Sequence, residues 1–141
     1  MTDARRAAFL SGVLFGTVLI FVDAMALRFA GAVATGALLI RLWATSQGLA
    51  GTDIARIGII AGLVMGVTRQ FLLLILMILG VFFEPTPALM QPPSDTMLYE
   101  FQQAWGYDYY TVHVLFDVLG GAVGAAVGAL LTTRIYGTDT P

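Results

Sequence analysis

Four long apolar stretches make up most of this chain, and they restrict its fold more than any other feature. They cover approximately residues 7–27, 29–49, 57–83 and 110–131. Roughly 20 apolar residues at 1.5 Å each suffice for a helix to cross the hydrocarbon core of a bilayer. Only 11% of the residues are charged, against roughly 25% in soluble domains. We therefore expect an all-α integral membrane four-helix bundle that forms one transmembrane domain over residues 1–141.

The orientation of the bundle follows from the arginines that flank these stretches. Cytoplasmic flanks of membrane helices are enriched in Lys and Arg. Four spans with the N-terminus inside leave only Arg28 on the external side and place five arginines in the cytoplasm: Arg5, Arg6, Arg41, Arg56 and Arg134. We expect a multi-pass protein of the cell membrane with both termini cytoplasmic.

Arg41 interrupts the second stretch, which therefore spans the membrane only if that side chain reaches the headgroups beside Trp43. If residues 29–49 dip into the membrane without crossing it, Arg5 and Arg6 change sides. This alternative moves two arginines away from the favoured cytoplasmic side, so four spans are the expected topology. The sequence pattern leaves the alternative open.

The external loop is expected over residues 84–109. Four prolines in its first half forbid a continuous helix. Ser94 and Asp95 are good N-cap residues, and apolar side chains follow them at helical spacing. We expect a short helix lying in the membrane interface, followed by tyrosines of an aromatic belt, which either anchors the bundle or docks a partner.

Small residues recur every four positions in three of the stretches. Residues at i and i+4 share a helix face, so each set forms a groove that admits another helix backbone. The expected packing glycines are Gly12 and Gly16 in the first stretch, Gly58, Gly62 and Gly66 in the third, and Gly120, Gly124 and Gly128 in the fourth. All of them fall in the cytoplasmic half. We expect them to bring the first, third and fourth helices together there, although assembly between protomers would use the same grooves.

A candidate intramembrane polar cluster consists of Asp23, Arg69, Gln70, His113 and Asp117. An ionised side chain near the bilayer centre costs roughly 2.5 to 3.5 kcal/mol and needs a partner or water. Arg69 lies near the middle of its stretch, and Asp117 lies about 10 Å inward from the start of its own, so the two are at similar depth. We expect them to form an ion pair that faces the bundle interior. The pair either fixes helix register or, with His113 one turn away, forms a proton or ion relay open to the external side.

Other chemistry finds little support in the sequence. The chain has no cysteine, one histidine, no lysine and a net charge of −2. We expect no catalytic constellation, no metal site, no cofactor and no nucleic-acid partner.

The resulting functional expectation is a structural or accessory membrane protein. Its partners would be the lipid bilayer and either further copies of itself or a larger membrane complex. The alternative is a small transporter or ion-conducting module that uses the polar cluster. An enzyme acting on membrane lipid is a third possibility, which would require a second acid or histidine at the depth of Asp117.

Overall fold

The computed structural model describes residues 2–22, 24–44, 50–79 and 109–136, and their regular structure is helical throughout. The elements are α1 (Thr2–Val18), the 3₁₀ turn η1 (Leu19–Phe21), α2 (Met25–Leu39), the π-helical turn η2 (Ile40–Ala44), α3 (Gly51–Ile78), α6 (Tyr109–Leu115), the π-helical turn η3 (Phe116–Gly120) and α7 (Gly121–Ile135). The expected external loop and its interfacial helix lie outside the described residues, except for Tyr109, which begins α6.

Four helices in the described part of the chain are long and apolar enough to cross a membrane: Asp3–Phe21, Met25–Leu42, Gly51–Leu76 and Thr111–Ile135. Their number agrees with the prediction, but the first boundary differs. The first expected stretch continued to Leu27, whereas Val22 and Ala24 adopt extended conformations and α2 begins at Met25. Neither glycine nor proline marks this boundary, and Asp23 is the one charged residue in the sequence there.

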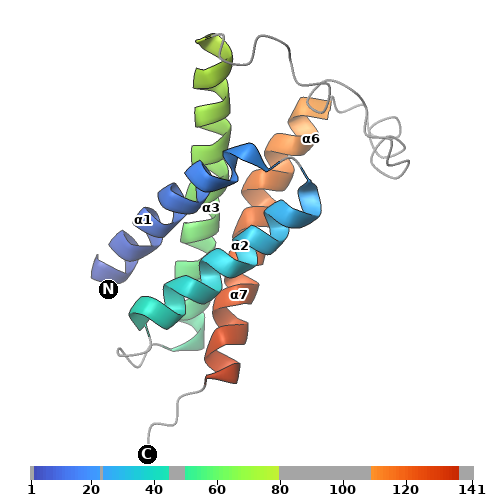
Figure 1. The fold of residues 1–141 in the computed structure, drawn as a ribbon. Helices are drawn as coiled ribbons and strands as arrows, with labels where there is room; N and C mark the ends of the chain where they lie inside the picture. The colour runs from blue at the N-terminus through green and yellow to red at the C-terminus, as the bar shows by residue number, and fades with distance from the viewer. Residues whose placement is uncertain (1, 23, 45–49, 80–108, 137–141) are drawn as a thin grey trace, which may run out of the picture.

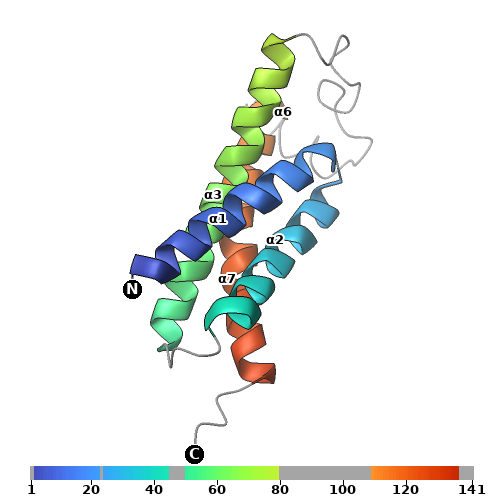
Figure 2. The same ribbon diagram turned by 60° about the vertical axis from the view of Figure 1, so that its left-hand side comes forward.

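The second span packs only slightly against the spans directly before and after it in the sequence. α1 packs chiefly on α3, α3 on α7, and α7 on α2. Figures 1 and 2 show α1 and α2 as a hairpin inclined across the two longer rods, α3 and α6–α7. The α1–α2 connection lies below the upper end of α3, which extends beyond it.

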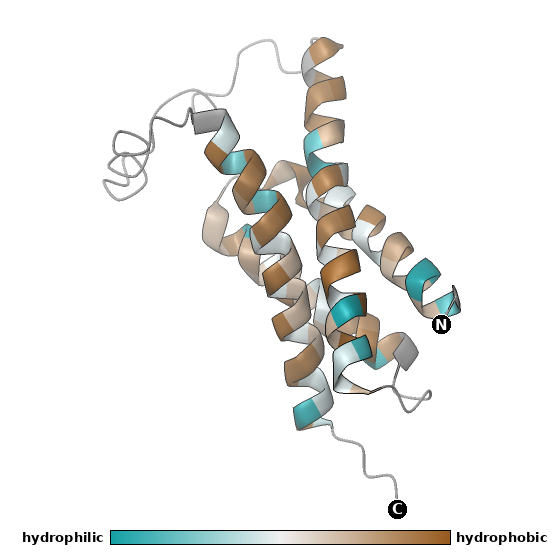
Figure 3. Ribbon diagram, turned by 180° about the vertical axis from the view of Figure 1, so that it is seen from behind, coloured by the Kyte–Doolittle hydropathy of each residue, from teal (hydrophilic) through white to brown (hydrophobic). Residues whose placement is uncertain are grey.

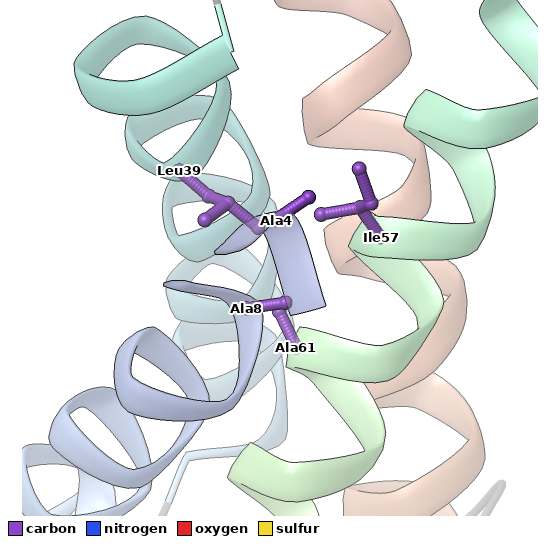
Figure 4. Close-up of a cluster of buried hydrophobic side chains, with 5 residues drawn as sticks. All are labelled: Ala4, Ala8, Leu39, Ile57 and Ala61. Atoms are coloured by element: carbon purple, nitrogen blue, oxygen red, sulfur yellow. The ribbon is translucent and has the colours of Figure 1, made fainter. Parts of the chain in front are cut away.

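Alanines and glycines make up much of the interior beside buried Leu, Ile and Met side chains, and many large apolar side chains are exposed. One core cluster joins α1, α2 and α3 and contains Ala4, Ala8, Leu39, Ile57 and Ala61 (Figure 4). Large side chains such as Phe9, Phe21 and Phe71 are exposed, and hydrophobic residues predominate along the helices (Figure 3). Membrane bundles favour this distribution, because close backbone packing replaces a hydrophobic drive between helices.

The glycines of α1 and α3 admit neighbouring backbones of the same chain. A Cβ atom on Gly12 or Gly16 would lie 2.6 Å from a carbonyl oxygen of α3. On Gly58 it would lie 2.8 Å from the carbonyl oxygen of Ala125, and on Gly62 or Gly66 it would overlap the backbone of Gly121 or Asp117. These grooves are therefore filled within the chain.

Among the packing glycines expected in the fourth stretch, the prediction is wrong for Gly120. A Cβ atom there would meet only the ring of Phe116 in its own helix, at 3.7 Å. The π-helical turn η3 adds a residue to the helical repeat, so spacing by four does not carry across it. Gly121, which the sequence pattern missed, faces α3 instead, whereas Gly124 and Gly128 face α2.

This difference yields a matched pair of variants. Gly62→Ala should lower the free energy of unfolding in detergent by roughly 2 kcal/mol, because the added methyl group overlaps the backbone at the start of α7. Gly120→Ala should leave it unchanged or raise it by up to about 1 kcal/mol through helix propensity. Reversible unfolding of both variants, followed by circular dichroism, measures the difference; equal effects would contradict this packing.

Candidate functional site

Charged and polar side chains from four elements meet inside the bundle. Arg28 comes from α2, Arg69 from α3, His113 from α6 and Asp117 from η3. Arg28, Arg69 and Asp117 are each 4% exposed, and His113 is 7% exposed. From here on, the polar cluster denotes these four residues and Gln70, which is the observed set and differs from the set predicted from the sequence.

Asp117 is the acceptor at the centre of the polar cluster. Its Oδ1 atom accepts a hydrogen bond from Arg28 Nη1 at 2.7 Å, and its Oδ2 atom accepts one from Arg69 Nη1 at 2.5 Å. Gln70 Nε2 donates to Oδ2 as well, also at 2.5 Å. Both arginine contacts are buried ion pairs, so one carboxylate forms ion pairs with two guanidinium groups.

Arg69 also connects the polar cluster to the backbone where α1 ends. Its Nε atom donates to the carbonyl oxygen of Leu19 at 2.9 Å, and Nη2 donates to that of Val22 at 3.1 Å. The last carbonyl groups of a helix have no partner within the helix. Away from water such groups cost free energy unless they are bonded. Arg69 supplies a donor to the Val22 carbonyl and a second donor to the Leu19 carbonyl, which also accepts the Val22 N–H at 3.1 Å, so Arg69 acts as a C-terminal cap for the first helix.

His113 joins the polar cluster through Arg28 rather than through Asp117. Arg28 Nη2 lies 2.8 Å from His113 Nδ1. A guanidinium group can only donate, so Nδ1 is the acceptor and the imidazole is neutral, with its proton on Nε2. Arg28 additionally lies 6.0 Å from the ring centroid of Phe116, within cation–π distance.

Local backbone geometry brings the carboxylate to α3. Gly66 has no side chain, so the backbone of Asp117 packs directly against it. Arg69 and Gln70 follow Gly66 by three and four residues, which places them on the same face of α3 one turn further along. A short aspartate side chain can therefore reach both donors.

The structure brings together most of the residues singled out in the sequence. Arg69 and Asp117 form the expected ion pair, and Gln70 and His113 lie beside it. Asp23 lies outside the described residues.

The predicted position of Arg28 is wrong. The sequence placed it outside as a flanking charge, whereas it is buried and pairs with Asp117. Because α2 begins at Met25, Arg28 lies within its first turns instead of in a loop. One signal was available: Arg28 is four residues before Ala32 and eight before Gly36, and both small residues are buried on the same face of α2.

A cavity of about 10 Å³ lies beside the polar cluster. Arg28, Arg69 and Asp117 contribute to its wall, together with apolar side chains and glycines. This volume is close to the minimum that accommodates one water molecule. Among the described residues, no group of three or more His, Cys, Asp and Glu side chains is placed to hold a metal ion.

Comparisons with protein-family models, with curated proteins and with solved structures found no match to this chain. The geometry of the polar cluster therefore carries the functional argument.

Charge balance predicts an order among three variants. Asp117→Asn leaves two buried cations facing each other and should destabilise the protein most, by roughly 3–5 kcal/mol. Arg69→Gln keeps one ion pair but removes the donors to Leu19 and Val22, so its cost should be intermediate. Arg28→Gln leaves the pair of Arg69 with Asp117 and should cost least.

Chemical unfolding of the three variants in one detergent measures this order. Greater damage from Arg28→Gln than from Asp117→Asn would contradict it.

Proposed function

We propose that the protein is a four-span membrane protein with both termini in the cytoplasm. Its support is the position of the seven arginines. Two of them, Arg28 and Arg69, are buried. The five exposed ones all lie near one end of the bundle, where α1 and α3 begin and α2 and α7 end: Arg5, Arg6, Arg41, Arg56 and Arg134. With Arg28 inside the bundle, the asymmetry that the positive-inside rule uses is larger than the sequence count implied.

Within the membrane we propose a structural or accessory role, in which the protein packs with itself or with a larger membrane complex. The observation that supports this role is the set of hydrogen bonds within the polar cluster. Both oxygens of Asp117 are occupied, and the guanidinium group of Arg69 is divided between Asp117 and two backbone carbonyls. Groups bonded in this way stabilise a fixed arrangement of α1, α2, α3 and η3 and leave little room for a passing ion.

The surface for association is then the part of α3 that extends beyond the α1–α2 connection (Figure 2). The glycine grooves are filled within the chain, so they do not serve a partner. Between Phe71 and Leu79 none of the described side chains is buried, and Phe71 and Ile78 are 60% and 73% exposed. We propose that this segment, the α3 extension, contacts the partner.

Transport of a proton or ion is the second candidate, because His113, Arg28 and Asp117 are joined by hydrogen bonds. The order of these groups weakens it. Arg28 lies between the imidazole and the carboxylate, and a guanidinium group remains protonated in proteins. A proton transferred between His113 and Asp117 would have to bypass it.

Flux measurements separate the two roles. The purified protein in liposomes should pass protons and monovalent ions no faster than protein-free liposomes under an imposed pH or ion gradient, because the cavity beside the polar cluster measures only about 10 Å³. A pH-dependent flux that disappears in His113→Gln, with the variant still folded, would support transport instead. Protease protection of the reconstituted protein serves as the control for correct insertion.

Cross-linking tests the α3 extension. The chain contains no cysteine, so a single introduced cysteine reports one position. Leu74→Cys should form cross-links to a second copy or to a co-purified subunit in native membranes, whereas Leu14→Cys on the outer face of α1 should not. Both leucines are exposed, which makes them a matched pair. Equal cross-linking at both positions would contradict a contact that is specific to α3.

A further inference from the structure

The first turns of α1 form an exposed groove that combines positive charge with apolar surface. Its volume is about 460 Å³, and it is lined by Arg5, Arg6, Phe9 and Leu10. We propose that this groove binds an anionic phospholipid, with the phosphate between the two arginines and an acyl chain along the outer face of α1. The proposal rests on the membrane location proposed above and is independent of the structural role.

Helical spacing places the charged and apolar parts in the order that a phospholipid requires. Phe9 follows Arg5 by four residues, and Leu10 follows Arg6 by four. Each apolar side chain therefore lies about 6 Å further along the helix than its arginine, on the same face. With the N-terminus of α1 at the membrane surface, the guanidinium groups lie at headgroup depth and the apolar side chains at the level of the acyl chains.

An apolar track continues from the groove along α1. Leu10, Leu14 and Val18 repeat every four residues and are 67%, 62% and 58% exposed. Gly12 and Gly16 lie on the other side of the helix, where they contact α3, so the track faces away from the bundle. An acyl chain can lie along it without displacing any described side chain.

Charge favours an anionic occupant. In the described part of the chain, ion pairs involve Arg28, Arg56 and Arg69, and no carboxylate pairs with Arg5 or Arg6. The acidic side chain nearest in sequence is the exposed Asp3, in the first turn of α1. The first turns of α1 therefore hold two arginines and one aspartate, which gives them a net positive charge. A second copy packed here about a two-fold axis along the membrane normal would place the same arginines against each other, which disfavours a dimer at this surface.

Lipid retention by the full chain tests the proposal. The wild type is first shown to remain in membranes after alkaline extraction, so a failure of membrane location is recognised separately. It is then purified in mild detergent with equal amounts of phosphatidylglycerol and phosphatidylcholine, and bound lipid is measured by native mass spectrometry. We expect preferential retention of phosphatidylglycerol.

The decisive comparison uses two double variants with the same change in charge. Arg5→Gln/Arg6→Gln should weaken phosphatidylglycerol binding roughly five-fold for each arginine removed. Arg56→Gln/Arg134→Gln removes two exposed arginines from α3 and α7 and should leave binding within two-fold of the wild type, on the order of measurement error for such affinities. Leu10→Ser/Leu14→Ser should also weaken it, and glycerol 3-phosphate, which has no acyl chain, should not compete.

Three results would overturn the proposal. They are equal retention of the two lipids by the wild type, equal losses in the two arginine double variants, and a dimer that is present in the wild type and absent from Arg5→Gln/Arg6→Gln. The last result would assign the groove to protein contact.

Discussion

The bonds of Arg69 are the constraint on which the rest of the structure depends. One guanidinium group holds the carboxylate of η3 and the carbonyl groups at the end of the first helix, while its own backbone belongs to α3. Inside an apolar bundle neither a charge nor a free carbonyl group can rely on water. The place at which the α1–α2 hairpin reverses is therefore tied to the position of Arg69 on α3. Moving the turn by one residue would remove partners from both sides.

The small-residue faces and the polar cluster depend on each other. Asp117 reaches α3 because Gly66 allows the two backbones to touch, and the grooves of Gly58 and Gly62 keep the same two helices close over further turns. Close backbone packing supplies attraction between helices in a lipid environment. The buried ion pairs then select one register among the several that a smooth glycine face would permit. A hydrophobic replacement could fill the same volume, but it would remove the Arg69 donor to the Val22 carbonyl and one of the two donors to the Leu19 carbonyl.

The sequence predicts this architecture where a physical rule acts through spacing alone. The number of apolar helices follows from segment length, and the pairing of Arg69 with Asp117 follows from counting depth at 1.5 Å per residue. The α1–α2 turn could not be found in this way, because Asp23 is the one charged residue at this point and single charged residues also interrupt other apolar stretches, as Arg69 and Asp117 do. The π-helical turn was also hidden, since Phe116–Gly120 has no composition that distinguishes it from an α-helix. Because the α1–α2 turn was missed, Arg28 was predicted as an external flanking charge. Because the π-helical turn η3 was missed, Gly120 was predicted as a packing glycine.

Position along the bundle separates the two kinds of surface that the protein presents. The α1–α2 hairpin is inclined and ends below the top of α3, so the polar cluster lies where the tightly packed part of the bundle stops (Figure 1). Beyond it, α3 carries large exposed side chains and no glycine before residue 80. Large side chains keep neighbouring backbones apart, whereas glycines let them touch. A partner at the α3 extension would therefore have to interleave its own side chains with Phe71, Leu74 and Ile78, which requires a complementary helix surface. Lipid chains can fit a surface of any shape, as along the track on α1. The two contacts that we propose, a partner at the α3 extension and a lipid along the start of α1, thus lie toward opposite ends of the bundle.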